Sequence, residues 1–592
     1  MTLRALGNTA RITLGMEHEK YSMTRLASAH DTLKSSYDVI VVGSGYGGGV
    51  TASRLSRAGK RVAVLERGRE ILTGEFPAKF PDLKNDMQVR GKTLRTGPNT
   101  ALFDVRLGAD MHVLVGCGLG GGSLVNAGVS LRPDPRVFSD EVWPGQVAQD
   151  GTLDQGFARA EKWLRPSSDP RASEMTKYKV LDGAAKSLGH VMVAPRIAVS
   201  FEANTNPAGV EQPACTRCGD CCGGCNVGAK NTVALTYLPD SVRHGAELFT
   251  EITVRHVEKL SNGTWRVHAV RSNVADPASD PGFTIEAPFV VLAAGTLGST
   301  EILLRSRAKG LAVSDRLGER FSANGDIIAF GYGSKTPVNA IGVGHPSKVD
   351  GLEIGASVSG QLEVHDADNL DNEMCVQEGA MPSAIAPALP LMFLPNGRLL
   401  GALQSLINGV YKGPFASMQT FFAVSHDSAS GRFKLEDDKL SLAWPNAKDE
   451  PVYKRLDAVL QGIVAHAGGD YVKNPMAGTV MGHQPATAHP LGGAVMGRDC
   501  DSGVVNHKSQ VFDARAGGAG STAVYKGLYV IDGSIIPRSL GVNPLFTITA
   551  LSERAMIHFA ADHGLQFDDE SVIGDEPVRV SEPGMVRRME SV

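Results

Sequence analysis

The strongest hydrophobic pattern lies near the start of the chain, where two short apolar runs flank a glycine-rich stretch. Residues 38–42 are mainly β-branched and apolar, as in a strand that is buried on both faces. A second apolar run ends at Glu66. Between the two runs, the spacing G-x-G-x-x-G is formed by Gly43, Gly45 and Gly48. The pattern predicts a strand, a glycine turn, a helix and a second strand.

Glycines at this spacing are typical of a dinucleotide site. Gly43 permits the tight turn, Gly45 lets the backbone approach a pyrophosphate, and Gly48 lets the helix pack closely on the strand. The helix N-terminus offers free N–H groups and a partial positive charge to phosphates. Glu66 stands where a carboxylate accepts hydrogen bonds from ribose hydroxyls. We therefore predict a dinucleotide-binding βαβ unit; the alternative is a glycine turn in an unrelated α/β sheet.

Further apolar runs predict an α/β protein with more than one domain. Alternating residues between 246 and 270 predict strands, and residues 289–298 predict a buried strand that leads into a helix. Residues 70–110 are polar and rich in turn formers, and we predict no strand pair there. Residues 320–480 are expected to form a sheet with helices.

Residues 379–410 are the least polar part of this second region. Arg398 is the only charged residue among them, and four prolines forbid a continuous helix. An irregular apolar segment of this kind fits the lining of a channel for a water-insoluble substrate. It fits ordinary core or a contact between subunits equally well.

Length and charge narrow the class of protein. The chain has 592 residues, enough for two or three domains, and a formal net charge of -4, which gives no sign of nucleic-acid binding. No apolar run approaches the roughly 18 residues of a spanning helix, which leaves peripheral membrane contact open. Residues 1–36 carry no secretory signal. Five of the eight cysteines lie within residues 215–225, unlike a secreted disulfide framework, so we expect a cytoplasmic protein.

Three further stretches carry a resemblance to a known family. Five glycines in residues 116–122 precede an apolar run, which favours close approach to something flat or phosphorylated over a flexible surface loop. The other two are HPLGG at residues 489–493 and the pair YVIDGSIIP and GVNP at residues 529–537 and 541–544. With the first glycine motif they resemble the glucose–methanol–choline (GMC) family of flavin oxidoreductases, most closely its bacterial cholesterol-oxidase branch.

The resemblance implies an α/β (α+β) fold in which a Rossmann-like βαβ domain binds FAD and a discontinuous domain binds substrate. We expect a mobile leader at residues 1–36 and a mobile tail at residues 561–592. The FAD-binding domain is expected in three parts, at residues 37–140, 241–320 and 485–560. A connecting region with the cysteine-rich loop 215–225 is expected at residues 141–240, and a substrate-binding domain at residues 321–484.

The resemblance also assigns residues to the cofactor. At the nucleotide it implies Gly43, Gly45, Tyr46, Gly47, Gly48, Glu66 and Arg67, with a backbone contact to adenine from Val254. At the flavin it implies Gly120, Gly121, Ser123, Asn126, Asp532, Gly533, Asn543, Pro544 and Leu545.

For catalysis, the resemblance places His489 and Asn543 at the flavin, facing the substrate. Oxidising an alcohol removes a proton from oxygen and a hydride from carbon. A neutral histidine, with an ordinary pKa of about 6.5, accepts or orients the hydroxyl proton, and an asparagine amide donates to the oxygen as it becomes a carbonyl. Flavin N5 accepts the hydride. The alternative for His489 is a core histidine that caps a turn.

Cholesterol oxidases also use a glutamate on the substrate side as a proton acceptor. Glu378 lies a few residues out of register with that position and is the candidate for the role. A buried glutamate with a raised pKa would suit the task, whereas a solvent-exposed acid is the alternative.

The cysteine-rich loop has the spacing of an iron–sulfur site. The spacing C-x2-C-x2-C-x3-C is typical of bacterial ferredoxins and is formed by Cys215, Cys218, Cys221 and Cys225. A [4Fe–4S] cluster is therefore one interpretation. In ferredoxins the fourth cysteine of this spacing ligates a second cluster, so a single cluster here could take its fourth ligand from Cys117, Cys375 or Cys500. Zinc and structural or redox-active thiols are the alternatives.

Together these features predict an FAD-dependent oxidoreductase that converts the CH–OH group of a hydrophobic alcohol, a 3β-hydroxysteroid first, to the carbonyl. Oxygen accepts the electrons in this interpretation. In a second one, an oxygen-independent dehydrogenase passes them through an iron–sulfur cluster to a protein or quinone. A non-oxidising flavoprotein of the lyase type and a non-catalytic flavin-binding protein are further alternatives.

Overall fold

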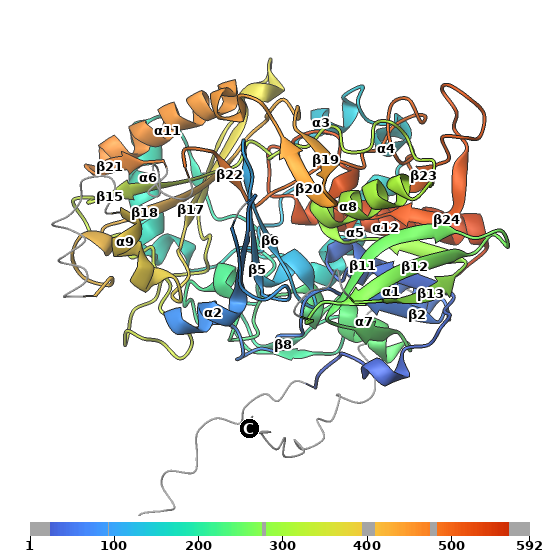
Figure 1. Ribbon diagram of the computed structural model, residues 1–592. Coiled ribbons are helices and arrows are strands. Elements are labelled where there is room, and N and C mark those ends of the chain that lie inside the picture. Colours follow the sequence, from blue (N-terminus) through green and yellow to red (C-terminus); the bar gives the residue numbers. More distant parts are fainter. Residues whose placement is uncertain (1–23, 93, 275–279, 394–408, 474–481, 568–592) are drawn as a thin grey trace, which may run out of the picture.

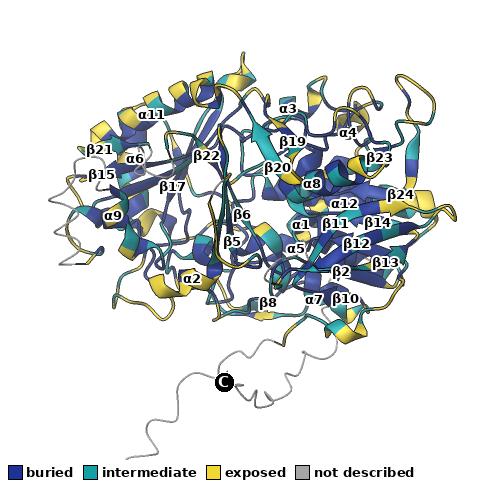
Figure 2. Cartoon of the chain, viewed as in Figure 1, coloured by how far each residue is buried: buried dark blue, intermediate teal, exposed yellow. Residues whose placement is uncertain are grey.

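The computed structural model describes residues 24–92, 94–274, 280–393, 409–473 and 482–567. Two six-stranded sheets lie at opposite ends of the molecule, and a five-stranded sheet stands between them (Figure 1). We call the end with β1 (Val39–Val42) the nucleotide half and the end with β17 (Met374–Gly379) the substrate half. Both end sheets are buried along most of their strands (Figure 2).

The sheet of the nucleotide half has the strand order β10-β2-β1-β14-β24-β23. Its first five strands are parallel, with Val39 opposite both Val62 and Phe289, and β23 is antiparallel to β24. Every residue of β1 is buried, as its apolar pattern predicts. Beside β1, the bounds are β2 (Val62–Leu65), β10 (Glu247–Phe249), β14 (Phe289–Leu292), β23 (Gln510–Phe512) and β24 (Val524–Val530).

Helices and a smaller sheet cover this parallel sheet. Helix α1 packs against α7 and α12, α5 packs on α12, and α8 packs on β11 of the three-stranded sheet β11-β12-β13. The predicted order of strand, glycine turn, helix and strand is confirmed. The bounds are α1 (Tyr46–Arg57), α5 (Thr152–Leu164), α7 (Tyr237–Arg243), α8 (Gly295–Ala308), α12 (Leu545–His563), β11 (Ile252–Lys259), β12 (Trp265–Arg271) and β13 (Phe283–Ala287).

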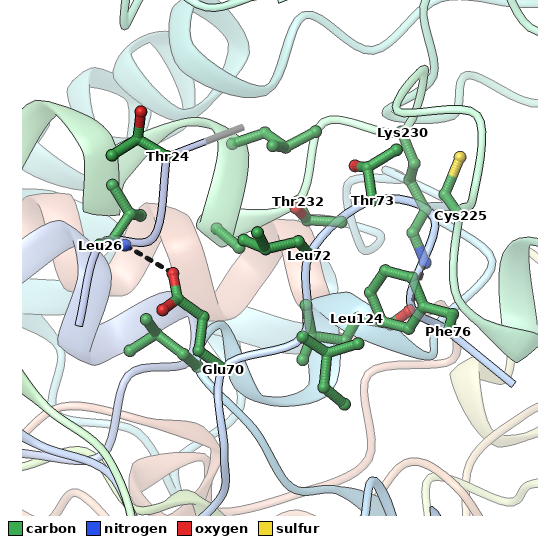
Figure 3. Close-up of a pocket in the computed structure, with 14 residues that line it drawn as sticks. Thr24, Leu26, Glu70, Leu72, Thr73, Phe76, Leu124, Cys225, Lys230 and Thr232 are labelled. Atoms are coloured by element: carbon green, nitrogen blue, oxygen red, sulfur yellow. Dashed lines mark hydrogen bonds between the residues drawn. The ribbon is translucent and has the colours of Figure 1, made fainter. Parts of the chain in front are cut away.

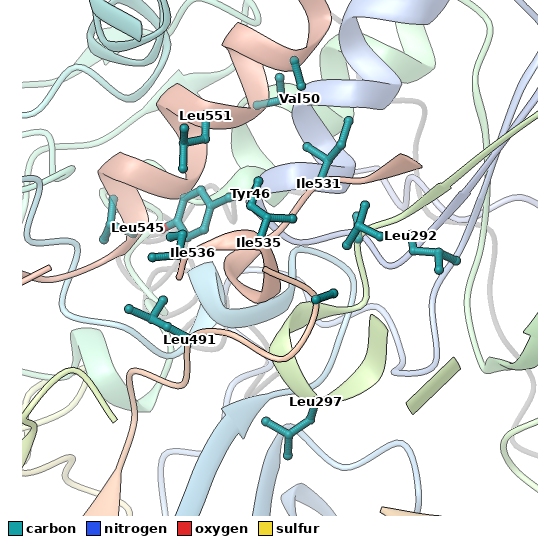
Figure 4. Close-up of a cluster of buried hydrophobic side chains, with 14 of the residues drawn as sticks. Tyr46, Val50, Leu292, Leu297, Leu491, Ile531, Ile535, Ile536, Leu545 and Leu551 are labelled. Atoms are coloured by element: carbon teal, nitrogen blue, oxygen red, sulfur yellow. The ribbon is translucent and has the colours of Figure 1, made fainter. Parts of the chain in front are cut away.

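The start of α1 meets the C-terminal segment in one apolar cluster. Tyr46 and Val50 of α1 lie beside Ile531, Ile535 and Ile536 and beside the first two turns of α12 (Figure 4). Residues almost five hundred positions apart therefore form one core. This packing fixes the nucleotide turn against the HPLGG and GVNP segments.

The sheet of the substrate half has the order β21-β15-β18-β17-β16-β7 and is antiparallel. Helices α6 and α11 pack against one another and against this sheet. The buried residues of α11 recur at three- and four-residue steps, so one face of the helix is buried (Figure 2). The bounds are β7 (Met192–Val193), β15 (Ile327–Tyr332), β16 (Gln361–Val364), β18 (Gln419–Val424), β21 (Asp470–Val472), α6 (Thr176–Ser187) and α11 (Pro451–Ala467).

The central sheet corrects one prediction. Residues 70–110, for which no strand pair was predicted, contribute three of its strands in the order β22-β6-β5-β3-β4. Their apolar pattern is interrupted because Asp104 is fully buried and forms ion pairs with Arg67 and Arg106 at 2.7 and 2.8 Å. The bounds are β3 (Met87–Arg90), β4 (Arg95–Thr96), β5 (Phe103–Leu107), β6 (His112–Gly116) and β22 (Ala486–Thr487).

The predicted leader is also partly corrected. Residues 24–36 pack on the nucleotide half, where Ala27 bridges Leu248 and the Leu26 N–H donates to the Glu70 carboxylate at 2.6 Å. Residues 1–23 lie outside the described residues. At the other end, α12 continues to His563, inside the predicted tail, and residues 568–592 lie outside the described residues.

Short elements complete the described chain. The apolar segment 379–410 contains only one short α-helix before residue 394, in keeping with its prolines, and residues 394–408 lie outside the described part. No described helix is long and apolar enough to cross a membrane. The remaining bounds are α2 (Leu83–Asp86), α3 (Arg136–Ser139), α4 (Gln146–Gln149), α9 (Leu389–Phe393), β8 (Asn204–Thr205), β9 (Glu211–Gln212), β19 (Arg432–Glu436) and β20 (Lys439–Ala443).

Candidate flavin and substrate site

The glycine turn after β1 leaves no room for side chains. Gly43 has φ +96°, and a Cβ atom there would lie 2.3 Å from the Ala293 carbonyl oxygen. A Cβ atom on Gly48 would lie 2.0 Å from the Gly43 carbonyl oxygen, so α1 packs directly on the strand end. At Gly47 it would lie 1.7 Å from the Ile531 oxygen. Glycine is therefore required at these three positions by the protein itself.

Gly45 differs from its neighbours because its Cβ position faces open space on the protein side. The nearest atom to a Cβ there is the Gly121 Cα, 4.0 Å away. Gly121 belongs to residues 116–126, which we call the glycine loop, and it has φ +56°. The two glycine stretches thus face one another. Their bare backbones, at the N-terminus of α1, fit the phosphates of a dinucleotide.

Glu66 at the end of β2 ties these two stretches together. Its carboxylate accepts hydrogen bonds from the Ser44 N–H at 3.1 Å, the Ser44 hydroxyl at 2.6 Å and the Gly68 N–H at 2.8 Å. Ser44 in turn accepts from the Gly120 N–H at 3.0 Å. The predicted ribose acceptor therefore lies at the glycine turn, where it also holds the glycine loop.

The other predicted nucleotide residues lie around this turn. Arg67 donates to Asp104 and to the Asn99 carbonyl at 3.2 Å, so its guanidinium is anchored on the central sheet. Val254 is buried in β11, the strand whose first amide donates to the Glu66 carbonyl at 2.8 Å. A contact from its backbone to adenine stays a prediction.

The polar residues of the glycine loop are engaged within the protein. The Ser123 hydroxyl donates to the Gly120 carbonyl at 2.6 Å and accepts from the Val233 N–H at 3.0 Å. The Asn126 amide donates to the Tyr46 hydroxyl at 2.8 Å. These bonds hold the loop in shape and connect it to the start of α1.

Asp532 links two elements that border the same region. Its carboxylate accepts from the Gly295 N–H at 2.9 Å, from Ser299, and from the backbone and hydroxyl of Ser534. Burial raises the pKa of this carboxyl group. The four donors use its acceptor capacity, so its side chain joins the start of α8 to Gly533.

Pro544 and Leu545 lie at the start of α12, where unpaired backbone N–H groups carry partial positive charge. Leu545 lies near Tyr46 (Figure 4). A flavin site between the glycine loop and this helix end is therefore consistent with the donors that the chain presents.

His489 is held by a carboxylate that the sequence motifs do not include. Its Nδ1 lies 3.3 Å from the Asp326 carboxylate, which is 2 % exposed. Asp326 also accepts from the Ala488 N–H at 2.8 Å and from the Thr487 hydroxyl at 3.1 Å. The Nδ1 atom makes no hydrogen bond, so its contact with Asp326 is an electrostatic one. With a proton on Nδ1 facing the carboxylate, Nε2 is the acceptor of the ring.

Asn543 is held in a similar way by Gln377. The Gln377 amide donates to the Asn543 carbonyl oxygen at 2.6 Å, and both side chains are buried. Because its oxygen is occupied, the Asn543 amide is oriented with its NH2 group free to serve as a donor. Gln377 lies on β17, whereas Asn543 lies just before α12.

The loop of residues 322–326 connects the two catalytic candidates. The Ser322 N–H donates to the Leu491 carbonyl at 3.0 Å, and the Asn324 amide donates to the Val542 carbonyl at 2.8 Å. Asp326 at the end of the loop contacts His489. The HPLGG and GVNP segments are thus joined through one loop at the start of β15.

The structure does not bring Glu378 to this group, and the prediction for it is corrected. Successive residues of a strand face opposite sides, so Gln377 takes the position beside Asn543. The Glu378 carboxylate accepts from Lys177 at 2.5 Å and from the Ser359 N–H at 2.8 Å. Burial outweighs the attraction of Lys177 and raises the pKa of Glu378 to about 7.

Comparison with known families identifies the chain. The profile of GMC oxidoreductases matches residues 37–323, and the profile of their C-terminal region matches residues 449–552. The chain belongs to the GMC oxidoreductase family. This GMC enzyme is therefore an FAD-dependent oxidoreductase that acts on alcohols, and the glycine surfaces described above fit that cofactor.

The relatives of this GMC enzyme are similar along most of their length. A cholesterol oxidase of Mycobacterium tuberculosis (strain ATCC 25618 / H37Rv) is 27 % identical over 584 residues, which cover 88 % of this chain and 91 % of the relative. A cholesterol oxidase of Acinetobacter baumannii is 28 % identical over 571 residues, covering 90 % and 95 %. A long-chain-alcohol oxidase of Arabidopsis thaliana is 24 % identical over 542 residues, covering 86 % and 65 %.

Solved structures agree on the fold. The crystal structure of pyridoxine 4-oxidase from Mesorbium loti superposes with a TM-score of 0.57 at 17 % identity, over 89 % of this chain and 99 % of that one. A fungal aryl-alcohol oxidase gives the same TM-score at 15 % identity, over 90 % and 100 %. The GMC fold predicted from the motifs is confirmed.

The cysteine loop, residues 215–225, lies beside the flavin region of this GMC enzyme. All of its cysteines are free thiols, and two sulfurs accept backbone hydrogen bonds at 3.4 Å, Cys215 from Arg217 and Cys221 from Ser357. Positive φ values at Arg217 and Gly219 produce the tight curl. Burial and the neighbouring Asp220 and Cys221 raise the pKa of Cys218 to about 12.

The spacing of these sulfurs bears on what they could hold. Among the described residues, the only histidine, cysteine or acidic side chains with three ligand atoms within 4.8 Å of one another are Asp150, His507 and His558. No three of the cysteine sulfurs therefore lie within 4.8 Å of one another among the described residues, as the ligands of one zinc ion would. A cluster of several irons requires wider spacing between its thiolates.

Proposed function

We propose that this enzyme oxidises the secondary hydroxyl of a hydrophobic alcohol, a 3β-hydroxysteroid first, to the ketone. The observation that carries the proposal is the pair of supported polar groups, His489 on Asp326 and Asn543 on Gln377. One arrangement supplies a proton acceptor and the other an oriented N–H donor. These are the two groups that removal of a proton and a hydride from CH–OH requires.

In this proposal His489 accepts the hydroxyl proton at Nε2 while Asp326 stabilises the positive charge that forms on the ring. Asn543 donates to the same oxygen as its bond order to carbon increases. The bound FAD supplies the acceptor for the hydride. The alcohol thus loses two electrons and two protons, and its C–H and O–H bonds are replaced by the second bond of the carbonyl.

The choice of a hydrophobic substrate has separate support. The relatives are named for cholesterol and for long-chain alcohols. In this chain, aromatic and apolar side chains cluster on the substrate sheet next to residues 379–393. Phe330, Tyr332, Phe393 and Phe415 make ring contacts there with centroids 5.3 to 5.5 Å apart.

The test is anaerobic mixing of the flavin-loaded enzyme with candidate alcohols. A 3β-hydroxysteroid is expected to remove the visible absorbance of oxidised flavin and to yield one equivalent of the 3-ketone. The 3α epimer and a long-chain primary alcohol are the matched comparisons for stereochemistry and shape. Flavin that stays oxidised with every alcohol would contradict the proposal and favour a lyase-type or non-catalytic flavoprotein.

A second candidate function, an oxygen-independent dehydrogenase, is favoured by the cysteine loop. We propose that Cys215, Cys218, Cys221 and Cys225 hold a [4Fe–4S] cluster. Two observations support this: the ferredoxin spacing, and the free thiols with backbone N–H donors on two sulfurs. Such a cluster would pass the electrons of the alcohol to a protein or quinone.

Iron and sulfide analysis of anaerobically purified protein tests this site. The wild type is expected to contain about four irons per chain. Cys221→Ser is expected to lose them, whereas Cys222→Ser, the adjacent cysteine outside the spacing, is the matched control and should retain them. A wild type without iron would make the thiols structural and leave oxygen as the acceptor.

A further inference from the structure

Lys230 is a fully buried cation between the glycine loop and the cysteine loop. It is 1 % exposed. Its Nζ donates to the carbonyl oxygens of Leu124 and Asn126, each at 2.9 Å, and of Cys221 at 2.8 Å. The first two carbonyls belong to the glycine loop and the third to the cysteine loop. One ammonium group therefore joins the backbone at the flavin region to the backbone of the sulfur site.

The charge of Lys230 has no carboxylate partner within the described part of the chain. Its three hydrogen bonds all go to neutral carbonyl oxygens. Burial lowers the pKa of Lys230, and the ionisable side chains that oppose this shift are Cys221, Cys225 and Cys222. Buried cations in proteins are nearly always compensated by an anion. Because the ammonium contacts the cysteine loop through the Cys221 carbonyl, an anionic cluster held by that loop would supply the compensation.

The apolar surroundings of Lys230 strengthen the electrostatic interaction of its charge with neighbouring groups. Leu72, Phe76 and Leu124 line the small pocket that contains its aliphatic stem, with Cys225 at the same edge (Figure 3). Gly224, next to Cys225, packs on Phe76, where a Cβ would lie 2.1 Å from the ring. A charge in such an apolar setting acts more strongly on its neighbours than one in water.

We propose that Lys230 is the fixed counter-charge of a metal cluster held by the cysteine loop, and that it raises the reduction potential of that cluster. This inference rests on the iron–sulfur site of the proposed function. A cluster with four thiolate ligands is anionic and gains one negative charge when it takes up an electron. A fixed positive charge beside it favours the reduced form, because net charge and hydrogen bonds near the sulfurs set the potential.

The position of Lys230 suits a role for the raised reduction potential in electron transfer from the flavin. Because the same ammonium binds the glycine loop, the sulfur site is held at a fixed place relative to that loop, where the flavin would bind. A raised potential lets the cluster accept one electron at a time from flavin that the alcohol has reduced by two electrons. A one-electron carrier protein then removes each electron from the cluster.

The experiment is a redox titration of the iron-containing holoenzyme with dithionite, followed by the electron paramagnetic resonance signal of the reduced cluster. Lys230→Met removes the charge and Lys230→Arg keeps it. In Lys230→Met we expect the ratio of reduced to oxidised cluster at a fixed potential to fall about tenfold, a shift of about 59 mV for one electron. Lys230→Arg is expected to stay near the wild-type potential.

Iron content and the far-ultraviolet circular dichroism spectrum separate the outcomes. Loss of iron from folded Lys230→Met but not from folded Lys230→Arg also supports the counter-charge. An unchanged potential in Lys230→Met with full iron content overturns the role of Lys230 and leaves the cluster standing. Equal loss of iron from both variants overturns it as well. A wild type without iron overturns the cluster proposal, and this inference with it.

Discussion

The two halves of the molecule contribute to the site in different ways. In the nucleotide half, the site is formed mainly by backbone atoms, because Gly43, Gly47 and Gly48 are packed so closely that no Cβ atom fits. Where the substrate half meets it, the site depends on pairs of side chains that join the two halves, His489 with Asp326 and Asn543 with Gln377. A backbone site is encoded by neighbouring residues, whereas a side-chain pair joins positions far apart in the chain.

The difference predicts how each half responds to substitution. A side chain added to the glycine turn displaces backbone, so both folding and cofactor binding should fail. Removal of one partner from a side-chain pair leaves the backbone in place, so the flavin should stay bound while the rate falls. The predictions below test this contrast, beginning with the largest effect.

Gly47→Ala is expected to abolish flavin binding and to destabilise the fold by more than about 3 kcal/mol, because its Cβ would meet the Ile531 carbonyl oxygen at 1.7 Å. Thermal unfolding and flavin content measure both effects. Gly183→Ala is the control in α6, away from the glycine turn, since the nearest atom to its Cβ position is the His466 Nε2 at 3.9 Å. A folded, flavin-loaded Gly47→Ala variant would contradict the account of this half.

Gly45→Val separates cofactor approach from folding. The nearest protein atom to its Cβ is 4.0 Å away, so the protein itself tolerates the first carbon of a side chain. If the pyrophosphate approaches this backbone, the variant should fold but retain little flavin. Normal flavin content at the wild-type melting temperature would place the pyrophosphate elsewhere.

His489→Ala is expected to reduce the rate of flavin reduction by the alcohol about 10²- to 10⁴-fold, the usual contribution of a general base. Flavin content should equal that of the wild type, because the glycine turn is untouched. Stopped-flow absorbance measures the rate and the visible spectrum measures the content. Lost flavin would mean that His489 is part of the cofactor cradle.

Asp326→Asn is expected to have a smaller effect, about 10- to 100-fold in the rate of flavin reduction, as for other partners that orient a histidine. Asp326→Glu is expected to restore part of the rate, because it keeps a carboxylate beside the ring. Equal rates in the wild type and Asp326→Asn would contradict the role of Asp326.

The two faces of β17 allow a direct comparison. Gln377→Leu is expected to lower the rate about tenfold because one hydrogen bond that orients Asn543 is lost, about 1.4 kcal/mol. Glu378→Gln, one residue along, should leave the rate within about twofold, because its side chain faces Lys177. Steady-state kinetics on both variants measures this. The reverse order of effects would restore Glu378 as the proton acceptor on the substrate side.

The buried pair of Lys177 and Glu378 gives a pH-dependent term in stability. Burial raises the pKa of Glu378 to about 7, above that of the unfolded chain. The folded state therefore binds more protons between pH about 4.5 and 7, and this contribution is lost as the pH rises through 7. Denaturant unfolding should show wild-type stability falling over that range by at most about 3 kcal/mol relative to Glu378→Gln. Parallel curves would contradict the raised pKa.

The sequence predicted much of the nucleotide half and of the family fold. The β-branched run before Gly43 and the spacing of three glycines are local features, and the structure has the expected turn and helix there. The strands of residues 70–110 were missed because Asp104, which pairs with two arginines, is buried within them, where a strand pattern is expected to be apolar.

The side-chain pairs could not be predicted for a different reason. Asp326, Gln377 and Lys230 lie in no motif, and each acquires its role from a partner on another segment. Gln377 and Asn543 are 166 positions apart. Glu378 was proposed as a proton acceptor from its place in the sequence, but on a strand neighbouring residues face opposite sides, and here Gln377 faces Asn543 while Glu378 faces Lys177.

The most direct test of the account is a single-turnover comparison under anaerobic conditions. Wild type, Asp326→Asn and His489→Ala, each loaded with FAD, are mixed with a 3β-hydroxysteroid, and flavin reduction is followed by visible absorbance. We predict reduction in the wild type, a slower rate in Asp326→Asn, and the slowest rate in His489→Ala, at equal flavin content. Equal rates in all three would contradict the central claim that His489, held by Asp326, accepts the proton of the alcohol.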